Sequence, residues 1–169
     1  MTRRRASQVE DCPFVMLGER KITAAWTNTA GHMRAAQYVV LFEAAINRFL
    51  ADIGCSDADI ARRGAAPVLA EMHVSYAREL KAGDRVAITL QVLEIGAQSL
   101  HVYMRMAERA SGAEAAGVEL MILNLDLAAR KPRAWSMSQL AMLSVLEESH
   151  AELPRPAAVG RAIKAKSGK

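Results

Sequence analysis

The sequence predicts an α+β domain in which an antiparallel sheet wraps around one long helix. Residues 35–53 form a helical pattern that is apolar around most of its circumference. Four later stretches show the twofold alternation of half-buried strands, and one strand is expected before the helix. The helix therefore stands between strands that must share one sheet. The simplest closure of such a chain wraps the sheet around the helix.

The expected helix ends at Gly54, a natural C-terminal stop. Because its apolar residues leave only a narrow polar stripe, we expect it to be buried on several sides. Glu43 and Asn47 belong to that stripe and stand four residues apart, so they share a helix face. We expect Glu43 to make an interface hydrogen bond, and keep it as a second candidate for a catalytic base. The apolar positions are Tyr38, Val39, Leu41, Phe42, Ile46, Phe49, Leu50 and Ile53.

The remaining elements follow from alternation and turn signals. A first strand is expected over 20–27, ended by Thr29, Ala30 and Gly31. Further strands are expected over 68–79, 85–95, 99–109 and 118–127, joined as an antiparallel meander. Residues 56–66 are read as a loop or a short helix. A second helix is expected over 138–149, followed by two prolines.

Length and composition fit one domain over residues 13–149, since the chain has 169 residues, 51% of them hydrophobic. Residues 1–12 and 150–169 are expected to be flexible tails, the second one basic. These ends hold 8 of the 22 basic residues and 3 of the 18 acidic ones, leaving 14 and 15 between them. Because no aromatic residues interleave the tail charges, no nucleic-acid partner is expected. No apolar run approaches the roughly 18 residues of a membrane span, and no secretory signal is seen. We therefore expect a cytoplasmic protein without a membrane partner.

Three stretches carry a family resemblance: 26–33 with Tyr38 and Phe42 after it, 71–84, and 125–135. Together, over about residues 19–136, they resemble the hotdog thioesterases, in the 4-hydroxybenzoyl-CoA-thioesterase-like branch. The second stretch is similar to the acyl-CoA thioesterases associated with carnitine breakdown, among them the betainyl-CoA thioesterases. The resemblance implies a hotdog fold and hydrolysis of a short or polar acyl-CoA to the free acid and coenzyme A.

The resemblance also implies a homodimer, or a dimer of dimers, with its active sites between protomers near the N-terminus of the central helix. In the family a backbone N–H there polarises the thioester carbonyl, which suits the positive end of a helix dipole. The matching residues here are Gly31, His32 and Met33, and we expect them to form the catalytic oxyanion site. Glycine allows the substrate to approach the backbone closely.

Asn28 departs from the family pattern, because many relatives carry an aspartate three residues before this glycine. A neutral amide cannot take a proton from water or form an anhydride. Three interpretations stay open. Asn28 orients water while another carboxylate is the base, the chain is a slow or non-catalytic acyl-CoA-binding protein, or the alignment of this loop is shifted by a residue or two. Glu71 is the first alternative carboxylate, or else an ordinary exposed strand residue.

Further candidates concern substrate binding. Trp26, Tyr38 and Phe42 line the acyl pocket in one interpretation, with cation–π contacts to any quaternary ammonium group, and pack in the core in the other. His73 is expected beside Glu71, on a half-buried strand. A cluster of basic residues is expected to bind the coenzyme A phosphates. No metal site or cofactor is expected, because the histidines lack ligand spacing and no nucleotide-binding glycine loop occurs. The basic cluster comprises Arg130, Lys131 and Arg133.

Overall fold

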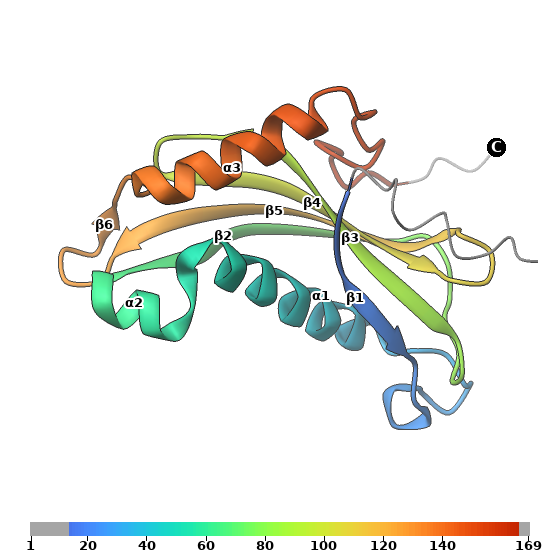
Figure 1. Ribbon diagram of the computed structural model, residues 1–169. Coiled ribbons are helices and arrows are strands. Elements are labelled where there is room, and N and C mark those ends of the chain that lie inside the picture. Colours follow the sequence, from blue (N-terminus) through green and yellow to red (C-terminus); the bar gives the residue numbers. More distant parts are fainter. Residues whose placement is uncertain (1–13, 166–169) are drawn as a thin grey trace, which may run out of the picture.

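The computed structural model describes residues 14–165, and it shows one curled antiparallel sheet wrapped around a central helix (Figure 1). The predicted α+β hotdog architecture is therefore confirmed. The segment 1–12, expected as a tail, lies outside the described residues. The helices are α1 (Ala35–Leu50), α2 (Asp57–Arg63) and α3 (Met137–His150). The strands are β1 (Val15–Lys21), β2 (Ala65–Tyr76), β3 (Arg85–Ile95), β4 (Ser99–Glu108), β5 (Glu114–Asp126) and β6 (Lys131–Pro132).

The strands lie in the order β1-β3-β4-β5-β2, and the short β6 also pairs with β5. The predicted meander is correct for β3, β4 and β5. It is wrong for β2, which pairs with β5 and not with the strand that follows it in sequence. The connection after β2 instead crosses near the start of α1, where Leu80 is buried and its carbonyl accepts the N–H of Met33 at 2.7 Å. This crossing places the end of β2 beside the start of α1.

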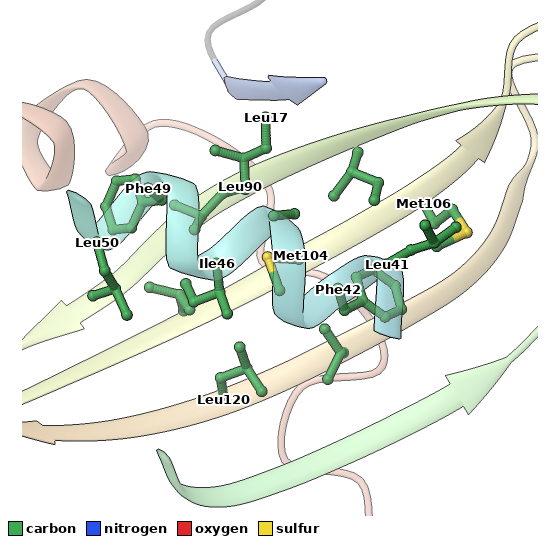
Figure 2. Packing of buried hydrophobic residues seen from close by; sticks show 14 of the residues in the cluster. Leu17, Leu41, Phe42, Ile46, Phe49, Leu50, Leu90, Met104, Met106 and Leu120 are labelled. Atoms are coloured by element: carbon green, nitrogen blue, oxygen red, sulfur yellow. The ribbon is translucent and has the colours of Figure 1, made fainter. Parts of the chain in front are cut away.

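The inner face of the sheet packs around α1 (Figure 2). Phe42 is fully buried and Phe49 is 2% exposed, as the apolar helix pattern requires. The regular α-helix ends at Leu50, three residues before the predicted end, and a π-helical turn continues to Cys55. Gly54 takes a φ of 81° in that turn, which favours a residue without a Cβ. The inner sheet residues against α1 include Leu90, Met104, Met106 and Leu120.

The first strand differs from its predicted position. It covers Val15–Lys21, and Ala24–Trp26 is a short 3-10 turn, whereas the strand was expected over 20–27. The reason is that β1 needs a partner: its last pair is Lys21 with Arg85, the first residue of β3. After Ile22, whose backbone still bonds to Gly83 and Asp84, β3 offers no further partner to hold an extended chain.

A β-bulge between Leu69 and Glu71 interrupts the alternation of β2. Leu69 pairs with Ile122, an inner-face residue, but Glu71 pairs with Met121 on the opposite, outer face. Two residues that are two apart therefore lie on different faces, because the bulge inserts one extra residue. The regular alternation expected for this strand is therefore broken at the bulge.

The C-terminal part of the chain packs against the sheet in two segments, the helix α3 and the residues that follow it. The predicted second helix is confirmed as α3, whose His150 Nδ1 accepts the N–H of Val92 at 2.9 Å. It thus covers the stretch of β3 that β1 leaves open. Residues 151–165, called the C-terminal strap here, then lie against the outer face, where the Gly160 N–H donates to Glu119 Oε2 at 2.8 Å. Among residues 14–165 no helix combines the length and apolarity needed to cross a membrane.

Candidate active site at the start of α1

The loop before α1 is organised by the Asn28 side chain. Its Oδ1 accepts the N–H groups of Ala30 at 3.0 Å and His32 at 3.1 Å. The backbone N–H of Asn28 donates to the His32 carbonyl at 2.8 Å. An asparagine oxygen that accepts two backbone donors in this way stabilises a tight loop. Because Oδ1 is committed to the loop, the amide Nδ2 is the part of Asn28 left for a substrate or a water.

The loop also uses the three N–H groups that were expected to bind the oxyanion. The Gly31 N–H donates to the Asn28 carbonyl at 2.9 Å, and the Met33 N–H donates to Leu80. With His32 held by Asn28 Oδ1, none of the three is available in this arrangement. The available donors lie slightly later, at Ala35 and Ala36. These exposed residues begin α1, where a helix supplies no partner for its first N–H groups.

His32 contacts a carboxylate that the sequence did not single out. Its Nε2 lies 3.3 Å from Glu79 Oε2, with side-chain exposures of 32% and 70%. An isolated bridge between His32 and Lys81 brings the two segments together. Glu79 is 47 residues away in sequence, and no periodicity marks it. An imidazole oriented by a carboxylate is a common general-base arrangement.

Two tyrosines flank the start of the helix. The Tyr76 hydroxyl, at the end of β2, donates to the Ala35 carbonyl at 3.3 Å. Its ring meets that of Tyr38 edge to face, with centroids 5.3 Å apart. Tyr38 is buried and its oxygen accepts the Leu80 N–H at 3.1 Å; burial raises its pKa, and this bond only partly offsets the effect. Tyr38 thus holds the crossing segment, while Tyr76, half exposed, stands at the surface of the site.

A groove of about 480 Å³ runs between α1 and β2. Its walls are mostly apolar and include Phe42, but Glu43 and Asn47 also line it. The predicted polar stripe of α1 therefore faces this groove. Phe42 serves both the core and the groove wall, and Trp26 is half-buried against the core. The other lining residues are Val39, Ile46, Leu50, Pro67, Val68, Leu69, Met72, Met104, Leu120 and Ile122.

Glu71 and His73 are not brought to the start of α1. Both line a hollow on the outer sheet face, together with His101 and Glu119. The bulge in β2 is the reason, since it turns Glu71 away from the helix. Within the protomer the structure thus offers Glu79, and not Glu71, as the carboxylate next to the loop. No group of three or more potential metal ligands gathers among residues 14–165.

The basic cluster near β6 lies at the other end of α1. Arg133 Nη1 donates to the Arg63 carbonyl at 2.9 Å and lies 3.4 Å from Asp126 Oδ2. Arg63 closes α2, which follows the C-terminal end of α1. The structure therefore separates this cluster from the start of α1 and gives Arg133 structural partners. Arg130 and Lys131 remain exposed.

Known proteins with similar sequences are thioesterases. The family model of the thioesterase-like superfamily matches residues 22–165. The betainyl-CoA thioesterase of Pseudomonas aeruginosa is 30% identical over 145 residues, covering 86% of this chain and 91% of that protein. An L-carnitine dehydrogenase/betainyl-CoA thioesterase of Ruegeria pomeroyi is 34% identical over 145 residues, which cover 86% of this chain. The match spans only 29% of that longer protein.

Solved structures agree on the fold. A protein of Staphylococcus aureus, characterised in complex with CoA, superposes with a TM-score of 0.86 at 21% identity, covering 90% of this chain and 96% of that one. The 1,4-dihydroxy-2-naphthoyl-CoA thioesterase of Synechocystis has a TM-score of 0.67 at 18% identity, with 85% and 99% covered. The predicted enzyme class, a thioester hydrolase, is confirmed by these relatives. The chain belongs to the thioesterase-like superfamily.

Proposed function

We propose that the protein hydrolyses a short or polar acyl-CoA thioester at the start of α1. The observation that carries this proposal is the pairing of open helix N–H groups at Ala35 and Ala36 with the His32–Glu79 contact a few residues earlier. The donors supply a place for the thioester oxygen, and the imidazole supplies a base. The names of the relatives support a small acyl group attached to coenzyme A.

In the proposed reaction, the thioester oxygen accepts hydrogen bonds from Ala35 and Ala36. These bonds and the helix dipole stabilise the negative charge that develops on that oxygen. Water attacks the carbonyl carbon while His32 takes one of its protons. The C–S bond then breaks, and the sulfur leaves as a thiolate that receives the proton from His32. Free acid and coenzyme A are the products.

Glu79 orients His32 in this scheme. The contact joins Nε2 to the carboxylate, so Nδ1 is the nitrogen that accepts the proton from water. Asn28 acts through geometry, because its Oδ1 fixes the His32 backbone and leaves the Nδ2 group to donate to water or substrate. This assignment removes the need for an aspartate at position 28.

The acyl group is proposed to enter the groove between α1 and β2. Val39 and Glu43 stand four and eight residues after Ala35, so they continue the same helix face away from the open N–H groups. An apolar wall with a carboxylate and an amide at Glu43 and Asn47 suits a short acyl group with a polar or cationic end. The same two residues are also suited to hydrogen bonds across an interface.

We further propose that two copies assemble through β2. This strand has twelve residues and lies at an end of the strand order, so one of its edges has no partner in the described chain. Its side chains Val68, Leu69 and Met72 are 41%, 46% and 38% exposed. An unpaired strand edge beside exposed apolar residues favours pairing with a second strand. The proposed setting is the cytoplasm, where the free, buried thiol of Cys55 would stay reduced.

The test compares hydrolysis of a panel of acyl-CoA thioesters by wild type and three variants. We expect His32→Gln to lower kcat by about 10²–10⁴-fold, the usual contribution of a general base. Glu79→Gln should cost no more than about fivefold, because an exposed pair contributes about 1 kcal/mol or less. Glu71→Gln is the matched control on the outer face and should keep full activity. Wild-type rates in His32→Gln would refute the assigned base, and no turnover of any panel member would refute the function.

A further inference from the structure

A second cavity lies on the outer side of the sheet, between β2 and the C-terminal strap, with a volume of about 640 Å³. We propose that this cavity binds the phosphate groups of the nucleotide part of coenzyme A. The inference rests on the proposed function only for the identity of the ligand. Its lining residues come from the end of β2, from β4 and β5, and from the strap; they include Tyr76, Ala77, Arg161 and Lys164.

The charges of the cavity favour an anion. Arg161 and Lys164 are exposed, and neither has an ion pair among residues 14–165. Glu114 is the acidic residue of the lining, and its charge is already compensated. Its Oε1 accepts the Tyr103 hydroxyl at 2.8 Å, and its Oε2 lies 3.2 Å from Arg105 Nε. The two strap cations are therefore left to face the cavity without a competing carboxylate, and phosphates are the ligands that such cations bind by charge-assisted bonds.

The strap is anchored to the sheet one residue before Arg161. The Gly160 N–H donates to Glu119 Oε2 at 2.8 Å, next to Arg161. Glu119 Oε1 in turn lies 2.8 Å from His101 Nε2, and both side chains are more than four-fifths buried. A ligand group is bound more tightly by side chains whose backbone is already held, because less freedom is lost on binding. The anchor thus makes the strap a defined wall of the cavity.

Position connects the cavity to the active site. Tyr76 lines the cavity, and its hydroxyl contacts the Ala35 carbonyl at the start of α1. A ligand that reaches around the end of β2 can therefore hold its thioester at α1 and its phosphates at the strap. The basic cluster near β6, expected from the sequence to bind these phosphates, lies at the opposite end of the helix. Its Arg133 is already engaged with Asp126 and Arg63.

The test measures binding of coenzyme A and of adenosine 3′,5′-bisphosphate by calorimetry. The double variant Arg161→Gln/Lys164→Gln should weaken both by about tenfold for each cation, since a charged hydrogen bond contributes that much. Arg130→Gln/Lys131→Gln removes the same charge from the other cluster and should bind as wild type does. Equal binding by the strap variant and wild type, or a loss confined to the control, would overturn the inference.

Kinetics separate this inference from the proposed hydrolysis. With an active acyl-CoA, the strap variant should raise KM and leave kcat unchanged. With the matching acyl-pantetheine, which lacks the nucleotide, KM should not change. If the strap variant weakens nucleotide binding but no acyl-CoA is hydrolysed, the phosphate site is supported and the proposed hydrolysis is refuted. If the strap variant raises KM equally for the acyl-CoA and for the acyl-pantetheine, the phosphate site is refuted.

Discussion

Asn28 provides a direct test of how the loop before α1 supports the reaction. Replacing it by alanine removes the oxygen that accepts the Ala30 and His32 N–H groups at 3.0 and 3.1 Å. Replacing it by aspartate keeps both acceptors and adds a negative charge. The two variants therefore separate the structural role of this side chain from the chemical role that a carboxylate would have.

The expected magnitudes follow from the hydrogen bonds. Each bond contributes about 0.5–1.5 kcal/mol, so Asn28→Ala should weaken the closed loop by about 1–3 kcal/mol. The loop is exposed, and most of this loss falls on the local geometry and not on global unfolding. A displaced His32 imidazole lowers the rate more than a lost contact does, because misplacement by about 1 Å can cost a hundredfold. We expect kcat to fall about 10–100-fold, with the melting temperature changed by a few degrees at most.

The assay measures kcat and kcat/KM side by side for wild type, Asn28→Ala and Asn28→Asp. Asn28→Asp should stay folded, because its carboxylate oxygens can accept the same two N–H groups. It should keep or raise the wild-type rate, since the added carboxylate can also take a proton from water. Wild-type activity in Asn28→Ala would refute the positioning role. Activity found only in Asn28→Asp would show that the natural chain binds acyl-CoA without hydrolysing it.

Three other outcomes test the fold. Phe42→Ala empties a fully buried position and should cost about 3–5 kcal/mol in unfolding free energy, measured by urea denaturation; a loss below about 1 kcal/mol would contradict the packing around α1. Burial by itself raises the pKa of Glu119, but the Gly160 N–H and His101 lower it by more, so this pKa lies below its ordinary range. The hydrogen bond from Gly160 to the Glu119 carboxylate is therefore complete above about pH 4.3, and it is lost as the pH falls through the lower folded pKa of Glu119. The Gly160 amide signal in NMR should report this loss. The same pH dependence should be absent in Glu119→Gln. Leu69→Lys should turn the proposed dimer into monomers in sedimentation, and an unchanged mass would remove β2 from the interface.

Local patterns in the sequence predicted the elements well. The long helix was found because its apolar period is unusually complete, and Phe42 and Phe49 are buried as that period requires. The bounds of β3 were predicted without error, since Val86, Ile88 and Leu90 alternate cleanly and their neighbours form turns. In these cases the information lies within one element and does not depend on distant partners.

The errors share a different cause. The bulge after Leu69 depends on the pairing of β2 with β5, and that pairing depends on a crossing that no local signal announces. Glu71 therefore lies with His73 on the outer face, away from the start of α1. The occupied N–H groups of Gly31 and Met33 could not be predicted either, because their acceptors are set by the folded loop and by Leu80. Glu79 became a candidate only when the fold brought it to His32.

One strand, β2, determines how these features combine. Its inner face forms a wall of the groove beside α1, and its outer face lies under the strap. Its last residue, Tyr76, reaches the first turn of the helix. The exposed apolar side chains beside its free edge, Val68, Leu69 and Met72, belong to the proposed interface and also line the groove. A change on the edge should therefore alter assembly and turnover together, whereas a change on the outer face should alter nucleotide affinity alone. Because these effects have different readouts, β2 variants can show whether the three proposed roles are independent.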